Sequence, residues 1–318
     1  MFAKALAGGL LALASLAAQA QGYPSQTVRI IVGFPPGGTT DVIGRLVAQE
    51  LSEALGKAVV VENRPGASGT IGGGLVAKSA PDGHTLLVVS STHGTAPALY
   101  STLPYEEKDL VPAALVATTP YVLVVHPNMA ATNMAQLLAY LKQNPGKVEY
   151  ASSSPGTAQH LAGELVQRMA GVNIVHIPYK GSGALLPDLL AGRVPMMFEN
   201  VAIMTPHIKK GSLRPIAVSS AKRTLLLPDV PTVAETGLAG FEVVGWFALL
   251  APAKTPPEII RRLNAGVNAA IVKPAIVTRF AELGAEPLAG SPDQAAAFIR
   301  GEQDKWGKVI RDAGIKQQ

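Results

Sequence analysis

The stretch Phe34-Pro35-Pro36-Gly37-Gly38-Thr39-Thr40-Asp41 joins a strand pattern to a helix pattern. Before it, residues 28–32 (VRIIV) form a short β-branched run, which is typical of a strand buried on both faces. After it, apolar residues recur at helical spacing from Val42 to Leu55, and Gly56 ends the pattern. The stretch is therefore predicted to be the tight glycine loop of a strand–loop–helix unit.

The chemistry of this loop suits a small anion. Gly37 and Gly38 have no Cβ, so the backbone can turn sharply and approach a guest closely. Thr39, Thr40 and Asp41 are residue types that cap helix N-termini. Backbone N–H groups and the positive end of the helix dipole meet at such a point, which favours a carboxylate. An ordinary capped turn between strand and helix would show the same residues.

The same pattern returns later in the chain. A strand is predicted over residues 148–151, a loop of small residues over 152–157, and a helix over 158–170. Further strand ends carry hydroxyls at Ser90, Ser91 and Thr92, which serve either the loop or a ligand, and a turn at residues 178–183. Strands are also expected over residues 121–125 and 245–252. Repeated units of this kind predict parallel sheets covered by helices, with ligands at the carboxyl ends of the strands.

Length and composition agree with an α/β protein of two doubly wound lobes with a ligand cleft between them. The chain has 318 residues, of which 48% are hydrophobic and 15% are charged. This is enough for two globular domains of ordinary size. We predict a signal peptide at 1–20, lobe 1 at 21–120 and 246–318, and lobe 2 at 121–245. The second lobe would then be inserted into the first.

The N-terminus has the composition of an export signal. Lys4 precedes an apolar run over residues 5–18, and Ala18-Gln19-Ala20 has the small-x-small form that signal peptidase recognises. The apolar run is shorter than the roughly 20 residues needed to span a bilayer. A soluble protein exported to the periplasm is expected.

Several classes of site are excluded or disfavoured. The chain has no cysteine, which excludes disulfides, thiolate metal sites and cysteine nucleophiles. Its six histidines show no metal-ligand spacing, so we expect neither a metal nor a cofactor. The net charge is +5, but the basic residues are scattered, so nucleic acid is not an expected partner.

The common catalytic motifs are also missing. The sequence contains no G-x-S-x-G elbow, P-loop or H-E-x-x-H motif. One enzymatic alternative is a secreted serine hydrolase that uses Ser152 or Ser153 as nucleophile and His160 as base. No acid or oxyanion partner is specified for it, so we expect a binding protein and not an enzyme.

Six motifs resemble those of the tripartite tricarboxylate transporter substrate-binding receptors, also called Bug receptors. They follow the family order over essentially the whole mature chain: VGFPPGGTTD (32–41), VENRPGASG (61–69), PDGHTLL (81–87), IPYKG (177–181), LPDVPT (227–232) and APAKTP (251–256). The resemblance implies a periplasmic binding protein of type II, in which two lobes close on a small carboxylate. It also implies a membrane permease as partner, although coupling to a sensor stays open, and a monomeric receptor.

The resemblance also implies which residues bind the ligand. The loops that match residues 34–41 and 152–160 would grip the carboxylate, partly through water, while two further turns line the cleft. The candidate ligand-binding residues are Phe34, Pro36, Gly37, Gly38, Thr39, Thr40, Asp41, Ser90, Ser91, Thr92, Ser152, Ser153, Ser154, Gly156, Thr157, His160, Tyr179, Lys180, Gly181, Glu199 and Asn200.

The sequence departs from the family pattern in places. Pro195 stands where an aspartate is common, and Glu199-Asn200 replaces a more usual aspartate-bearing end. Ala248 and Lys254 occupy positions that are often glycine. These departures leave the fold intact and the identity of the ligand open.

Overall fold

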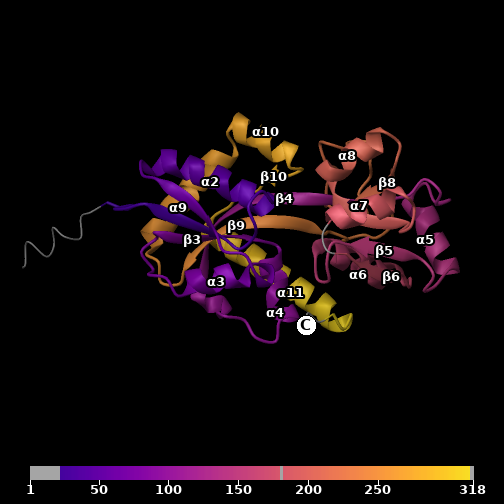
Figure 1. Ribbon diagram of the computed structural model, residues 1–318, viewed down its shortest axis with the longest axis horizontal. Coiled ribbons are helices and arrows are strands. Elements are labelled where there is room, and N and C mark those ends of the chain that lie inside the picture. Colours follow the sequence, from indigo (N-terminus) through magenta and orange to yellow (C-terminus); the bar gives the residue numbers. More distant parts are fainter. Residues whose placement is uncertain (1–21, 180–181, 316–318) are drawn as a thin grey trace, which may run out of the picture.

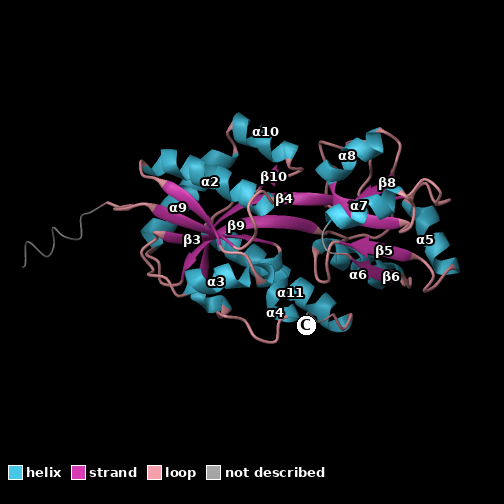
Figure 2. Cartoon of the chain, viewed as in Figure 1, coloured by secondary structure: helices cyan, strands magenta, loops and turns pink. Residues whose placement is uncertain are grey.

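The computed structural model describes residues 22–179 and 182–315. Two α/β lobes lie side by side in Figure 1, joined by the long strands β4 and β9. In Figure 2, helices lie on either side of the strands in both lobes. The fold is the α/β periplasmic binding protein fold that the sequence predicts.

Lobe 1 is built around a parallel core of three strands in the order β2-β1-β3, with β9 antiparallel beside β3. Its elements are β1 (Val28–Val32), α2 (Thr39–Leu55), β2 (Val59–Asn63), η2 (Ala67–Gly69), α3 (Thr70–Ala77), β3 (Thr85–Ser90), α4 (Thr92–Leu99), η3 (Glu107–Asp109), β9 (Val244–Pro252), α9 (Pro257–Ile271), α10 (Pro274–Glu282), β10 (Glu286–Pro287) and α11 (Pro292–Asp312).

Lobe 2 repeats the design with β7, β5 and β6 in parallel order and with β8 paired to β4. Its elements are α5 (Met134–Gln143), β5 (Glu149–Ser152), α6 (Ala158–Ala170), β6 (Val175–Pro178), α7 (Ser182–Leu190), β7 (Met196–Asn200), α8 (Val201–Lys209) and β8 (Arg214–Val218). In each lobe the carboxyl ends of neighbouring parallel strands share one edge.

Strand β4 (Leu110–Val125) belongs to both lobes. From Leu110 to Pro120 it pairs with β9, and from Tyr121 onward it pairs with β7 and β8. The prediction of a strand that begins only at residue 121 was therefore too short. Two register irregularities interrupt the pairing with β9, where β4 contains Pro112 and several alanines. The exchange of partners after Pro120 identifies the connection between lobes, while the exact domain limits stay a prediction.

The core is continuous across the lobes on one side of the molecule. Leu99 of α4 and Trp306, Val309 and Ile310 of α11 belong to the same buried cluster as the interior of lobe 2. Helix α11 therefore packs under both lobes, and it is held to lobe 1 by extensive contact with α4. Among the described residues, no helix combines the length and the apolar character required to cross a membrane. The predicted signal peptide at 1–20 lies outside the described residues.

Candidate functional site

Two loops, one in each lobe, have the same construction. Between β1 and α2, Gly37 adopts a left-handed φ of 84° and donates its N–H to Asp41 Oδ2 at 2.9 Å. Between β5 and α6, Gly156 has a φ of 74° and donates its N–H to His160 Nδ1, also at 2.9 Å. In both loops the acceptor lies four residues along the chain, in the first turn of the helix. Each left-handed position suits glycine, because a Cβ would make it strained.

The first loop is fixed by the carboxylate of Asp41. Its side chain is buried and accepts hydrogen bonds from Gly37 N–H, from Arg45 Nε at 3.0 Å and from Asn63 Nδ2 at 2.8 Å. Asn63 also donates to the carbonyl of Phe34 at 3.0 Å. Burial alone would raise the pKa of Asp41, but these donors hold it below its ordinary value. Asp41 therefore shapes the loop from inside and leaves the outer, exposed side to a guest.

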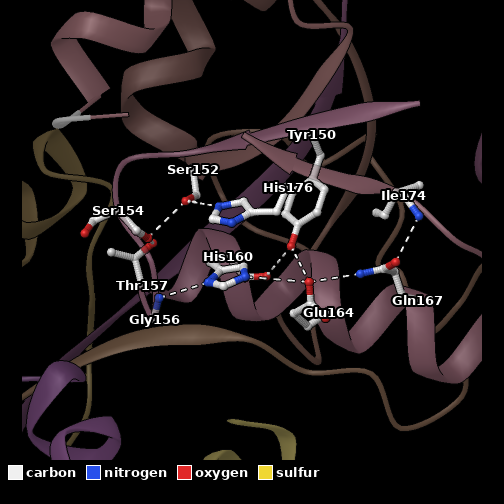
Figure 3. A network of polar contacts seen from close by, with 10 residues as sticks. All are labelled: Tyr150, Ser152, Ser154, Gly156, Thr157, His160, Glu164, Gln167, Ile174 and His176. Atoms are coloured by element: carbon white, nitrogen blue, oxygen red, sulfur yellow. Dashed lines mark hydrogen bonds and ion pairs between the residues drawn. The ribbon is translucent and has the colours of Figure 1, made fainter. Parts of the chain in front are cut away.

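The second loop is fixed by a buried group of polar side chains, shown in Figure 3. His160 stacks on His176, with ring centroids 3.7 Å apart. Its Nε2 lies 3.6 Å from Glu164 Oε1, and the Tyr150 hydroxyl donates to the same Glu164 oxygen at 2.7 Å. Burial, followed by the charge of His160, lowers the pKa of His176 to about 4. His160 was expected to bind ligand, and the structure places it beneath the loop as the acceptor for Gly156.

The hydrolase alternative is not supported by this geometry. Ser152 is fully buried, donates its hydroxyl proton to the Ser154 carbonyl at 3.0 Å and accepts from His176 Nε2 at 2.6 Å. Ser153 donates to Gln159 Oε1 at 2.5 Å. Neither serine is paired with His160, so the nucleophile and base drawn from the sequence do not form.

Both helices begin without a side-chain cap among the described residues. The N-cap of α2 is Gly38, which has no side chain to accept a hydrogen bond. The N-cap of α6 is Thr157, whose hydroxyl donates to the Ser154 carbonyl and caps no N–H of the helix. The first N–H groups of a helix have no partner within the helix. Together with the positive end of the helix dipole, such N–H groups favour an anion.

The serine and threonine at the end of β3 line a small cavity in lobe 1. Thr92 Oγ1 donates to the Ser68 carbonyl at 3.0 Å and lies 3.0 Å from Ser90 Oγ. Phe34, His93 and Tyr105 contribute rings to the same cavity. Ala67 and Ser68 both have a left-handed φ, which is uncommon for residues other than glycine. The structure thus brings Phe34, Ser90 and Thr92 together, while Ser91 is the N-cap of α4.

Two further candidate residues, Glu199 and Asn200, lie at the end of β7. Glu199 is buried and accepts from both Gln159 Nε2 and the Asn200 N–H. Asn200 caps α8 through Ala202 N–H and donates to the Leu283 carbonyl of lobe 1 at 3.3 Å. Its side chain therefore connects the two lobes.

The turn at residues 178–183 contains the remaining candidates. Tyr179 donates its hydroxyl to Asp188 Oδ2 at 2.9 Å, and Lys180 and Gly181 lie outside the described residues.

Sequence patterns did not identify Arg45, Asn63 and Gln159, which act on the site from neighbouring elements. The only signals for them were the motif that contains Asn63 and the predicted stretch 152–160, which includes Gln159. Over the described ranges, no group of three or more histidine and acidic side chains is placed to hold a metal ion.

The likeness to known proteins covers the whole of this architecture. Residues 43–315 match the sequence profile of the TctC family, described as "Tripartite tricarboxylate transporter family receptor". The chain belongs to this family of receptors. It is therefore a solute-binding protein and not an enzyme.

Individual TctC relatives resemble the chain along almost their full length. Protein BugT of Bordetella pertussis is 43% identical over 98% of this chain and 97% of its own. A solved R. palustris protein with adipate is 38% identical, with a TM-score of 0.79 over 93% of this chain and all of its own. MatC from Rhodopseudomonas palustris with bound malate is 32% identical, with a TM-score of 0.74 over 91% of this chain and 100% of its own.

Proposed function

We propose that this TctC receptor captures a small carboxylate between its two lobes, in the periplasm, and delivers it to a membrane permease of the tripartite tricarboxylate type. One observation carries the proposal: each lobe contributes an uncapped helix N-terminus whose loop is fixed by the same glycine hydrogen bond. Two such N-termini favour one negatively charged group held between them.

Other observations support the same function. Two of the relatives solved with small ligands hold adipate and malate, both of which are carboxylates. The apolar run and small-x-small site at residues 1–20 support export by a cleavable signal peptide. We propose that the receptor is a monomer, like the flytrap receptors it resembles.

Replacing Gly38 with tryptophan tests the proposed site. Gly38 has a φ of −76° that any residue adopts, and a Cβ there would approach nothing closer than the Pro35 carbonyl at 3.7 Å. Gly38→Trp is therefore expected to leave the protein folded, while the indole covers the start of α2. After a carboxylate library has been screened by thermal shift, calorimetry should show no binding of the best ligand to this variant.

A matched control separates this effect from the mere addition of an indole. Gly301 lies on the exposed face of α11, where a Cβ would meet nothing within 4 Å. Gly301→Trp should bind as the original protein does. Unchanged affinity in Gly38→Trp would contradict the proposed site.

A further inference from the structure

A chain of hydrogen bonds fixes which way one hydroxyl of the site points its proton. It begins at Glu199, whose two carboxylate oxygens lie 3.1 and 3.0 Å from Gln159 Nε2. The backbone N–H of Asn200 also donates to Glu199, at 2.7 Å, and holds the carboxylate in place. Since Gln159 Nε2 donates to both oxygens of Glu199, the NH₂ end of the Gln159 amide faces Glu199.

The orientation of Gln159 determines the role of Ser153. With its NH₂ group turned to Glu199, Gln159 presents its oxygen to Ser153 Oγ, 2.5 Å away. An amide oxygen accepts only, so the single hydroxyl proton of Ser153 is given to Gln159. Ser153 is partly exposed on the second loop, and toward a guest it presents lone pairs alone.

The same reasoning applies to Ser90 in the other lobe. The Ser68 carbonyl can only accept, so Thr92 gives it the proton of its hydroxyl, at 3.0 Å. The contact of 3.0 Å between Ser90 Oγ and Thr92 Oγ1 must then be donated by Ser90. Ser90, like Ser153, is partly exposed and presents lone pairs to a guest.

Two kinds of surface therefore meet a ligand at this site. Backbone N–H groups at the starts of α2 and α6 donate and suit a carboxylate. Ser153 and Ser90 accept, and a second acceptor such as another carboxylate oxygen would be repelled there. Resting on the function proposed above, we propose that the ligand is a carboxylate that carries a hydrogen-bond donor, a hydroxyl or amino group, facing Ser153 and Ser90.

Matched pairs of carboxylates test this directly. The hydroxyl pairs differ only in the donor: lactate and propionate, malate and succinate, 4-hydroxybenzoate and benzoate. The amine pairs, alanine with propionate and aspartate with succinate, differ also by the positive charge of the ammonium group. Thermal shift identifies the pairs that bind, and calorimetry gives both dissociation constants. In each binding pair the donor-bearing member should bind about tenfold or more tightly, because its analogue leaves desolvated acceptors unpaired.

Variants of the chain identify the source of the preference. Ser153→Ala should lower the affinity ratio within the pair severalfold, by weakening only the donor-bearing member. In Glu199→Gln the amide of Gln159 is free to turn, so Ser153 can donate, and the analogue without a donor should gain affinity. Ser212→Ala, in the turn at the far end of α8, should leave the ratio unchanged.

The outcomes are distinct. Equal or tighter binding of the analogues, or an equal loss of affinity for both members in Ser153→Ala, would overturn the inference while leaving carboxylate capture intact. If neither the donor-bearing carboxylates nor their analogues bind, the proposed function is overturned, and this inference with it.

Discussion

At the scale of single residues, the site depends on side chains that hold a loop from behind. Asp41 and His160 differ in charge and chemistry, yet each accepts the N–H of a glycine four residues earlier. A carboxylate can do so only with donors around it, which Arg45 and Asn63 supply. The imidazole of His160 accepts the same kind of hydrogen bond and leaves the second loop without a negative charge at that position.

Removal of the Asp41 carboxylate should weaken both fold and binding. Asp41→Ala leaves Gly37 N–H and Asn63 without their acceptor, so we expect the free energy of unfolding to fall by about 1–3 kcal/mol in urea titrations. Ligand affinity should also fall, since Gly37 is no longer held. Asp304→Ala, at an exposed position of α11, should change stability by less than about 0.5 kcal/mol. Equal stability of the two variants would contradict the role given to Asp41.

Two partly buried histidines predict how stability depends on pH. Burial lowers the pKa of His93 to about 4, and burial together with His160 lowers the pKa of His176 to about 4, from the ordinary 6.5. Between these values the unfolded chain binds protons that the folded chain does not. The free energy of unfolding should therefore decrease as the pH falls from about 6.5 to about 4.

Urea titrations across this range check the prediction. His176→Gln should give a flatter dependence than the original protein, because one of the two histidines is gone. The lowered pKa values of the carboxyls Asp41 and Glu164 add further losses of stability as the pH falls through their ordinary values of 3.8 and 4.5, in the same direction as the histidines. An identical slope in His176→Gln would show that His176 does not titrate in this way.

Sequence reasoning at this scale identified the loops but not the roles within them. Glycine, threonine and serine at a strand end indicate a ligand loop through composition alone. Whether His160 faces the guest or supports the loop depends on which helix face His176 covers, and that is a tertiary contact. At Lys254 the structure explains a feature of the family pattern. The φ of this residue is 67°, in the left-handed region that glycine adopts without strain, which explains why glycine is common at this position.

At the scale of elements, helix α11 is fixed to strand β9 through Glu302. Its Oε2 accepts from Trp306 Nε1 at 2.8 Å and from Trp246 Nε1 of β9 at 3.2 Å. Glu302 is 8% exposed, so both indole N–H groups depend on it for a partner. The apolar face of α11 was predictable from its spacing, whereas this inward-pointing carboxylate was not.

Glu302→Ala should therefore cost about 3 kcal/mol of stability, since two buried donors lose their acceptor. The chain has two tryptophans, and both donate to Glu302, so fluorescence in a urea titration reports on this cluster alone. Glu302→Gln keeps one acceptor oxygen and should cost less. Stability of Glu302→Ala within about 0.5 kcal/mol of the original protein would contradict this role for the carboxylate.

Strand β4 shows where element prediction failed and why. Residues 121–125 form an apolar β-branched run and were recognised, but residues 110–120 contain two prolines and three alanines. Those residue types are rare in strands. Pairing with β9, broken by two irregularities, overrides the weak local preference.

At the scale of the whole molecule, family motifs and repeated strand–loop–helix units together predicted the two-lobed fold. They could not show how the lobes meet. Leu99 of α4 lies against the second loop, where a Cβ on Gly156 would come within 2.5 Å of it. Asn200 joins lobe 2 to the turn after α10. Through Leu99, lobe 1 therefore reaches the loop between β5 and α6.

Both N-termini should act on one ligand, and a crystal structure with the tightest-binding carboxylate tests this most directly. The carboxylate oxygens should lie within hydrogen-bond distance, directly or through one water, of backbone N–H groups at the starts of both α2 and α6. A carboxylate that contacts only one of these helices, or neither, would contradict capture between the lobes.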